Sequence, residues 1–123
     1  MEQEKIKLHP VITCKEDMKA KEIAEILKNS NERRIFVIDN GEKLCGIITT
    51  TDLVYKSLAG NSLTAKEIMT KNIKSVDKKD PLEKAIEIMN EIKSYSCPVV
   101  EKGKIIGIIS YHDVVNHILN QEI

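Results

Sequence analysis

The sequence has few aromatic residues, with no Trp, one Phe and three Tyr among 123 residues. Because aromatic side chains supply much of the apolar area of most cores, this core has to be built from Ile, Val, Leu, Ala and Met. Gly and Pro are also few, at five and three, and 41% of the residues are hydrophobic. This composition is that of a globular chain and not of a disordered one. The length fits one domain, or two half-size units that share one core.

The chain also has no excess of positive or negative charge. The 19 basic and 19 acidic residues give a net charge of zero, and the basic residues are scattered along the chain. No strong field attracts nucleic acid, so we expect no nucleic-acid partner. No apolar run approaches the ~20 residues of a membrane span, and residues 1–5 carry no signal-peptide core. We therefore expect a cytoplasmic protein with no membrane partner.

The sequence also lacks the usual residue patterns of metal centres and active sites. Its three cysteines, Cys14, Cys45 and Cys97, are odd in number and widely spaced, which fits neither a zinc site nor a disulfide framework. We expect them to be buried, reduced thiols, as in the cytosol. His9 and His117 have no Cys, Asp or Glu at ligand spacing. Without a nucleophile–base pair, paired carboxylates or a Walker-type loop, we expect no catalytic residue, no metal and no enzyme.

The chain does contain a repeat. Gly46 to Asp52, with the sequence Gly-Ile-Ile-Thr-Thr-Thr-Asp, returns 61 residues later from Gly107 to Asp113 as Gly-Ile-Ile-Ser-Tyr-His-Asp. Upstream segments match at an offset of 62, because the turn at residues 39–42 is one residue longer than its counterpart. The chain is therefore a tandem duplication, with a first unit at residues 1–60 and a second unit at residues 61–123.

Each unit predicts the order β-α-β-β-α. Short β-branched strands at residues 11–14 and 73–76 precede helices with apolar stripes, which contain Ala20, Ile23, Ile26 and Leu27 in one copy and Leu82, Ala85, Ile86, Ile88 and Met89 in the other. Two strands around a tight turn follow, and the last strand leads into the helix that carries the Asp. The fold class is α/β (α+β). Since one unit is too small to close a core, we expect the two to pack sheet to sheet about a pseudo-twofold axis, with the Asp turns at one cleft.

Two local features refine this prediction. Asn40-Gly41 predicts a hairpin turn in which both residues adopt positive φ. Asp80 is expected to cap the helix of the second unit, with Pro81 at its first position and Glu83 completing a capping box.

The repeated motif suits a nucleotide. A phosphate is well bound at a helix N-terminus, where the hydroxyl of Thr49 or Ser110 adds a donor. Asp52 or Asp113 would repel a phosphate, but such a carboxylate can accept hydrogen bonds from both ribose hydroxyls. The alternative is that a hydroxyl and an Asp at this spacing only cap the helix, which stabilises it without any ligand.

These residues resemble a tandem pair of cystathionine-β-synthase (CBS) domains over residues 11–119. The resemblance is carried by both Gly-h-h-[Thr/Ser]-x-x-Asp motifs, by Cys97-Pro98-Val99-Val100 and by the segment Lys66-Glu67-Ile68-Met69-Thr70. The first copy departs from the pattern in two places: Phe36 stands where the second has Pro98, and Lys7-Leu8 replaces Met69-Thr70.

The resemblance implies two ligand pockets, each combining one motif turn with strands of the other unit. One pocket would use Thr13, Ile35, Phe36, Ser110 and Asp113. The other would use Ser75, Cys97, Pro98, Thr49 and Asp52, and it retains the Pro of the family. Arg33, Arg34 and Lys71 flank these segments, either to neutralise further phosphates or as solvated surface charges.

The expected function is that of a regulatory sensor module. Its ligand would be AMP, ADP, ATP or S-adenosylmethionine, bound as a regulator and not as a catalytic cofactor. The signal would pass to an unidentified effector protein or through self-association, with a homodimer as the expected state. The alternative is a ligand-free interaction or scaffold domain in which the Asp turns serve only as caps.

Overall fold

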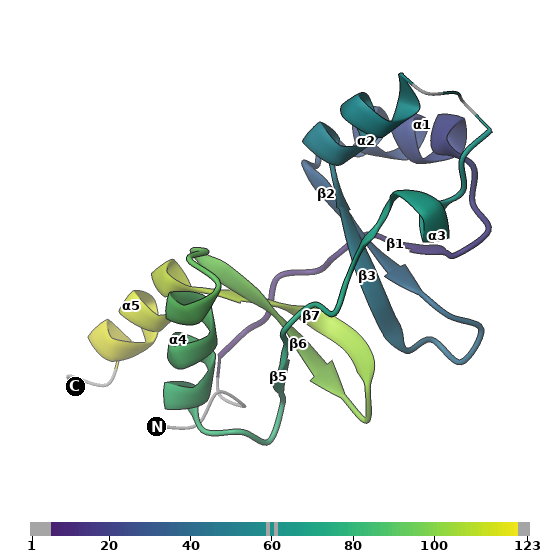
Figure 1. Cartoon of the computed structure of the whole chain (residues 1–123). Coiled ribbons are helices and arrows are strands. Elements are labelled where there is room, and N and C mark those ends of the chain that lie inside the picture. The colour runs from purple at the N-terminus through teal and green to yellow at the C-terminus, as the bar shows by residue number, and fades with distance from the viewer. Residues whose placement is uncertain (1–5, 59, 61, 121–123) are drawn as a thin grey trace. The chain divides into compact units, whose positions relative to one another are not determined.

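The computed structural model describes residues 6–58, 60 and 62–120. Contacts divide the chain into two compact units (Figure 1). The N-terminal unit is Ile12–Ile73, and the C-terminal unit joins residues 6–11 to residues 74–120. The predicted boundary between residues 60 and 61 concerns the sequence repeat and stays a prediction.

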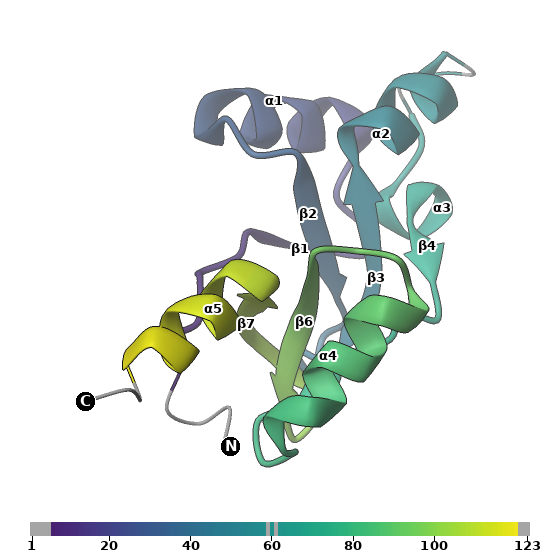
Figure 2. The ribbon, with the colours of Figure 1, turned by 90° about the vertical axis from the view of Figure 1, so that its left-hand side faces the viewer.

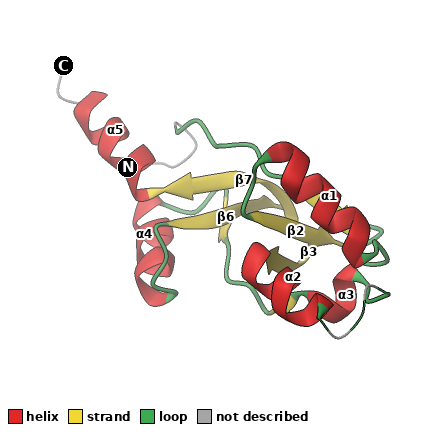
Figure 3. Ribbon diagram, turned by 90° about the horizontal axis from the view of Figure 1, so that it is seen from above, coloured by secondary structure: helices red, strands yellow, loops and turns green. Residues whose placement is uncertain are grey.

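The N-terminal unit places two long helices and a short one on one sheet. Its elements follow in the order β1 (Thr13–Lys15), α1 (Ala20–Ser30), β2 (Arg34–Ile38), β3 (Leu44–Thr49), α2 (Thr50–Ser57), α3 (Ala65–Ile68) and β4 (Thr70–Lys71). The sheet order is β1-β2-β3-β4, with β1 parallel to β2 and the other neighbours antiparallel. Figure 3 shows α1 beside α2, and the two helices contact each other.

The C-terminal unit repeats this plan. Its elements are β5 (Val76–Asp77), α4 (Leu82–Glu91), β6 (Ser96–Glu101), β7 (Lys104–Ser110) and α5 (Tyr111–Asn120). β5 is parallel to β6, and β6 is antiparallel to β7; α4 runs alongside β6 (Figure 2). The predicted β-α-β-β-α order is thus confirmed twice, and so is the mixed α/β class. The first strand of each unit begins later than residues 11 and 73, where we predicted it, because the parallel pairing starts at Thr13 and at Val76.

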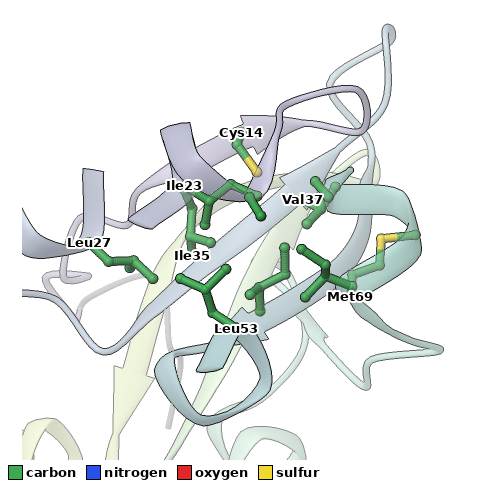
Figure 4. Close-up of a cluster of buried hydrophobic side chains, with 11 residues drawn as sticks. Cys14, Ile23, Leu27, Ile35, Val37, Leu53 and Met69 are labelled. Carbon is green, nitrogen blue, oxygen red and sulfur yellow. The ribbon is translucent and has the colours of Figure 1, made fainter. Parts of the chain in front are cut away.

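Aliphatic side chains build both cores, as the composition predicts. In the N-terminal unit the buried faces of α1, β2 and β3 meet around Ile23, Ile35 and Ile48, all 0% exposed (Figure 4). The C-terminal core is formed in the same way by the predicted stripe of α4 together with strand residues, including Leu82, Ala85, Ile88, Met89, Val99 and Ile109. Phe36 is also buried, but as the neighbour of Ile35 it points to the opposite face of β2.

The thiols only partly match the prediction. All three cysteines are free, and Cys14 and Cys97 are buried, but Cys45 is only half-buried. Burial raises the pKa of the Cys97 thiol to about 11. Burial, with a smaller contribution from Cys45, raises the pKa of the Cys14 thiol to about 11.

None of the described helices combines the length and the apolar composition that a membrane span requires.

The first hairpin forms where predicted, but its turn is of another kind. Asp39 Oδ1 accepts hydrogen bonds from the amides of Gly41 (2.8 Å) and Lys43 (2.9 Å), and Glu42 is the residue with positive φ, at 64°. The expectation of positive φ at Asn40-Gly41 was therefore wrong, because the Asp39 side chain organises a longer loop. In the second hairpin Lys102 and Gly103 both have positive φ, at 53° and 82°. This shorter turn accounts for the change of offset between the repeats.

The start of α4 also differs from the prediction. Pro81 has an extended ψ of 153° and is itself the N-cap, so that the first helical residue is Leu82. Pro81 has no side-chain oxygen and therefore gives this helix no side-chain cap. Asp80 instead accepts a hydrogen bond at 3.0 Å from the amide of Asp77, which closes the preceding turn. The predicted cap and capping box were therefore misplaced.

Each motif glycine lies where another segment crosses close to it. A Cβ atom on Gly46 would stand 2.5 Å from Met69 Sδ, and one on Gly107 would stand 2.7 Å from Leu8 Cβ and 2.8 Å from the carbonyl oxygen of His9. Ile108 pairs with His9 as Ile47 pairs with Thr70. The structural counterparts of Met69-Thr70 are therefore Leu8-His9, and not Lys7-Leu8 as the sequence alignment suggested.

Substitution of these glycines should lower stability to different degrees. We expect Gly107→Ala to cost about 1–3 kcal/mol of unfolding free energy because of overpacking. Gly46→Ala should cost less, since the Met69 side chain can move away whereas the His9 backbone cannot. Urea denaturation measures both, with Gly41→Ala as control, since its Cβ would meet its nearest neighbour at 3.4 Å. Equal losses for Gly107→Ala and Gly41→Ala would contradict the close approach.

Candidate functional site

The candidate site consists of the two turns at which a strand leads directly into a helix. β3 ends at Thr49 and α2 begins at Thr50, while β7 ends at Ser110 and α5 begins at Tyr111. In each turn the hydroxyl residue precedes the helix and the Asp is its third residue. This position sends the carboxylate back toward the free amide groups of the first turn. Both turns therefore have the geometry of a capping box.

In the N-terminal unit this box leaves part of the carboxylate available. Asp52 donates its backbone N–H to Thr49 Oγ1 at 3.1 Å, and the Thr49 amide donates to Asp52 Oδ2 at 3.3 Å. Among the residues that the structure describes, Asp52 Oδ1 accepts no hydrogen bond. The Asp52 side chain thus still has an oxygen to offer.

The equivalent carboxylate in the C-terminal unit is more fully bonded. Asp113 Oδ2 accepts hydrogen bonds from the Ser110 amide at 2.8 Å and from the Ser110 hydroxyl at 2.9 Å. Ser110 Oγ in turn accepts from the Asp113 amide at 3.2 Å. His9 Nε2 donates to Asp113 Oδ1 at 2.8 Å. Both oxygens of Asp113 are therefore engaged.

These contacts determine the charge state of Asp113. Burial of the carboxylate raises its pKa, but the two hydrogen bonds from Ser110 and the hydrogen bond and charge of His9 together lower it more. The pKa of Asp113 consequently lies below its ordinary value of 3.8. The side chain is ionised at neutral pH, as an acceptor of ribose hydroxyls has to be.

The two turns have equivalent backbone hydrogen bonds but different side chains around them. The Thr50 amide donates to the Arg33 carbonyl at 2.9 Å, and the Tyr111 amide donates to the Tyr95 carbonyl at 3.0 Å, so that the backbones correspond. The first turn borders a cavity of about 540 Å³, and its lining includes Arg33, Arg34, Thr49, Thr50 and Thr51. In the second unit Tyr95 and Tyr111 lie edge to face, with ring centroids 6.4 Å apart. The first turn thus lies beside two guanidinium groups and a row of hydroxyls, whereas the second has two tyrosine rings beside it.

The other predicted residues lie on the strands beside these turns. In the N-terminal unit Thr13 on β1 pairs with Phe36 on β2, and the neighbouring Ile35 pairs with Ile48. The guanidinium of Arg34 lies 6.0 Å from the centre of the Phe36 ring.

In the C-terminal unit Ser75 directly precedes β5. Cys97 and Pro98 lie buried in β6, opposite Ile109 and Ile108. Within each unit Ile35, Phe36, Cys97 and Pro98 lie on the strand that pairs with the motif strand. Thr13 on β1 and Ser75 directly before β5 lie one strand farther away. The grouping of the ten residues into two pockets stays a prediction.

Sequence reasoning missed one residue of this site, His9, and treated it only as a metal ligand to be excluded. The offset of 61 that relates Gly46 to Gly107 also relates Thr70 to His9. Applied upstream of the first strand, that offset would have placed His9 on the edge of β7. Among the described residues no group of three or more His, Cys, Asp or Glu side chains is arranged to hold a metal ion.

Comparison with known proteins gives the context of this geometry. A model of the CBS domain family matches the chain twice, at residues 4–59 and 65–120. The chain is 35% identical over 109 residues to a homoserine O-acetyltransferase of Methanosphaera stadtmanae, a match that covers 88% of this chain and 22% of that protein. It is 34% identical over 106 residues to an inosine-5′-monophosphate dehydrogenase of Aquifex aeolicus, covering 85% and 22%. The chain thus spans about a fifth of the length of these curated relatives.

Solved structures show the same fold over the full length. The CBS domain pair of protein MJ0100, in complex with 5′-methylthioadenosine and S-adenosyl-L-methionine, matches with a TM-score of 0.74 at 28% identity, covering 99% of this chain and 98% of that one. The cytosolic domain of the Mg²⁺ channel MgtE, in complex with ATP, matches with a TM-score of 0.75 at 23% identity, covering 87% and 44%. The second similarity is one of fold alone.

The bonding of Asp113 predicts a pH-dependent contribution to stability. Since its pKa is lower in the folded chain, this contribution is complete above the unfolded value and is lost as the pH falls through the folded value. Asp113→Asn should therefore cost about 1 kcal/mol of unfolding free energy at pH 7, as the loss of a cap does. The deficit should shrink as the pH falls below ~4.

Urea denaturation at pH 7, 5, 4 and 3 measures this deficit. The control is Asp17→Asn at an exposed position, which should leave the stability at pH 7 unchanged. A deficit of Asp113→Asn that stays constant down to pH 3 would show that the charge of the carboxylate contributes nothing.

Proposed function

Because the chain belongs to the CBS domain family, as a tandem pair of such domains, we propose that it is a regulatory module that binds an adenosine-containing ligand. The observation that carries this proposal is the Asp52 turn, which presents a carboxylate oxygen without a partner among the described residues. Asp52 lies in the first turn of α2, and Thr49, Thr50 and Thr51 of the same turn line a cavity with two arginines. The combination offers an acceptor for a ribose diol and donors for a phosphate.

Each residue has a stated part in this proposal. Asp52 and Asp113 accept ribose hydroxyls, and the Thr49 hydroxyl donates to the neighbouring part of the ligand. The Ser110 hydroxyl donates to Asp113 Oδ2 and offers its oxygen to the ligand instead. Arg33 and Arg34 neutralise phosphate groups at the first turn. The base lies against aliphatic and backbone groups of the strands, to which Thr13, Ile35, Phe36, Ser75, Cys97 and Pro98 belong.

The similar CBS domain pair of protein MJ0100 supports the class of ligand. Its structure contains 5′-methylthioadenosine and S-adenosyl-L-methionine, which share the adenosine part. AMP, ADP, ATP and S-adenosylmethionine are therefore the candidates for this chain. The ligand acts as a regulator, and we propose no catalysis by the chain.

A regulatory module has to pass its signal to a second copy of the chain or to an effector protein. A ligand changes the population of a conformation only if it binds that conformation more tightly than the others. α2 exposes Val54 and Tyr55, its C-cap residue Leu58 is exposed as well, and α5 exposes Val115, Ile118 and Leu119. Such exposed apolar groups are suited to contact with a second copy or an effector protein. We propose a homodimer, in a cytoplasm whose reducing conditions keep the three thiols free.

A second candidate function is a scaffold that binds no ligand. The capping boxes favour it, because in each turn the hydroxyl and the carboxylate already accept hydrogen bonds from each other's backbone amides. Capping and binding are nevertheless compatible where a carboxylate oxygen remains available, as it does in Asp52.

Thermal denaturation with adenosine compounds separates the two functions. A ligand at ~100 times its dissociation constant should stabilise the fold by about 2.7 kcal/mol, which raises the melting temperature by several degrees. AMP, ADP, ATP, S-adenosylmethionine and 5′-methylthioadenosine form the panel, and 2′,3′-dideoxyadenosine, which lacks the diol, is the control. A melting temperature that no compound changes at millimolar concentration would refute the sensor and favour the scaffold.

Substitution of the carboxylates tests the assigned residues. Asp52→Asn keeps the shape of the side chain but loses the charge that accepts the diol, and it should weaken binding about tenfold, as expected for a hydrogen bond to a charged group. Asp113→Asn should weaken the site of the second turn for the same reason. Calorimetric titration measures both, with Asp17→Asn as the unaffected control. Unchanged affinity in both variants would refute the assignment of the two carboxylates.

A further inference from the structure

The two motif carboxylates differ in one contact that comes from outside the repeated motif. His9 precedes the first strand of the chain, yet its Nε2 donates to Asp113 Oδ1 at 2.8 Å. Its counterpart in the N-terminal unit is Thr70, which pairs with Ile47 as His9 pairs with Ile108. Among the described residues, Thr70 makes no hydrogen bond to Asp52. Only the second turn therefore has such an additional donor.

The backbone holds His9 in this place. Its amide donates to the Ile108 carbonyl at 3.1 Å, and its carbonyl accepts from the Ile108 amide at 3.0 Å. On one side of it Leu8 packs against Gly107, and Ile6 belongs to the buried core of the unit. The imidazole itself is 58% exposed, whereas the side chain of Asp113 is 12% exposed. The backbone of the segment is thus held by hydrogen bonds, whereas more than half of the histidine side chain faces solvent.

The number of lone-pair sites that remain on each carboxylate decides whether it can accept a ribose diol. An ionised carboxylate offers about four lone-pair sites. Asp113 uses two of them for Ser110 and a third for His9, so that one site is left for a diol that needs two. Asp52 uses a single site, for the Thr49 amide. A ribose diol can therefore be accepted at Asp52 as the turn stands, but not at Asp113.

We propose that His9 controls the access of a ribose to Asp113, so that the Asp52 turn binds its ligand first and the Asp113 turn binds only when His9 swings away. This inference rests on the proposed function and defines the order in which the two turns are filled. Of the donors to Asp113, His9 is the one from outside the turn, so that its ring can leave Oδ1 without breaking a bond of the capping box. The Ser110 amide belongs to the backbone, and the Ser110 hydroxyl is also held by the Asp113 amide.

The test is calorimetric titration of the full chain with AMP and, separately, with S-adenosylmethionine, two probes that share the adenosine diol. His9→Ala should tighten the weaker binding event about fivefold, the factor that corresponds to ~1 kcal/mol for one hydrogen bond, and leave the tighter event unchanged. In the Asp52→Asn background the same gain should remain, since it belongs to the other turn.

Two matched variants make the result specific. Thr70→Ala alters the equivalent position of the N-terminal unit and should change neither event. His9→Gln keeps a side-chain donor and should behave more like the wild type than His9→Ala does. Melting temperatures of all variants without ligand show how far the pair also holds the segment in place.

Each result decides between distinct conclusions. A gain in His9→Ala alone supports control of access by His9. Equal or weaker binding in His9→Ala, even with a lowered melting temperature, would mean that the histidine only fastens the N-terminal segment, and would leave the proposed function intact. No binding of either probe to any variant would refute the proposed function, and this inference with it.

Discussion

The reciprocal hydrogen bonds between a hydroxyl residue and the Asp three positions later are the interaction on which the rest of the structure depends. They form where a strand leads into a helix without a loop, at Thr49–Asp52 and at Ser110–Asp113. A helix start at this point would otherwise leave backbone amides without partners. The same bonds fix the direction of the carboxylate. The hydrogen bonds that stabilise the helix start thus also hold the Asp carboxylate in a fixed orientation, in which it can accept further hydrogen bonds.

The close approach at Gly46 and Gly107 complements these turns. Each glycine lets a second segment lie against the motif strand, and in this way Met69 and Leu8 reach equivalent positions. The segment of the N-terminal unit comes from the connection after its own last helix, whereas that of the C-terminal unit comes from the start of the chain. Two segments of different origin therefore occupy one structural role. Because only one of them carries a histidine at the critical position, the duplication does not give two equal turns.

Sequence reasoning predicted the features that depend on local pattern. Period and spacing gave the β-α-β-β-α order, the buried stripes around Ile23 and Leu82, and the capping pattern of the motif. It failed where a distant or unexpected partner decides the geometry. The side chain of Asp39 replaces the expected turn at Asn40-Gly41, and the contact of His9 with Asp113 spans 104 positions, which no local pattern reveals. Burial and the bonds from Ser110 have the largest effects on the pKa of Asp113, and that same contact with His9 lowers it further.

Capping and ligand binding are often treated as competing explanations of a motif such as this one. The lone-pair count shows that they compete only when further donors are present. A carboxylate that caps with a single bond, as Asp52 does, keeps enough capacity for a diol. One that caps with two bonds and also receives a histidine does not. The capacity of each carboxylate is therefore set jointly by the motif hydroxyl, which in Ser110 donates to the carboxylate, and by the segment that crosses beside the motif. A donor from outside the motif, added to the Ser110 hydroxyl, makes the second copy of the duplicated site conditional while the first stays available.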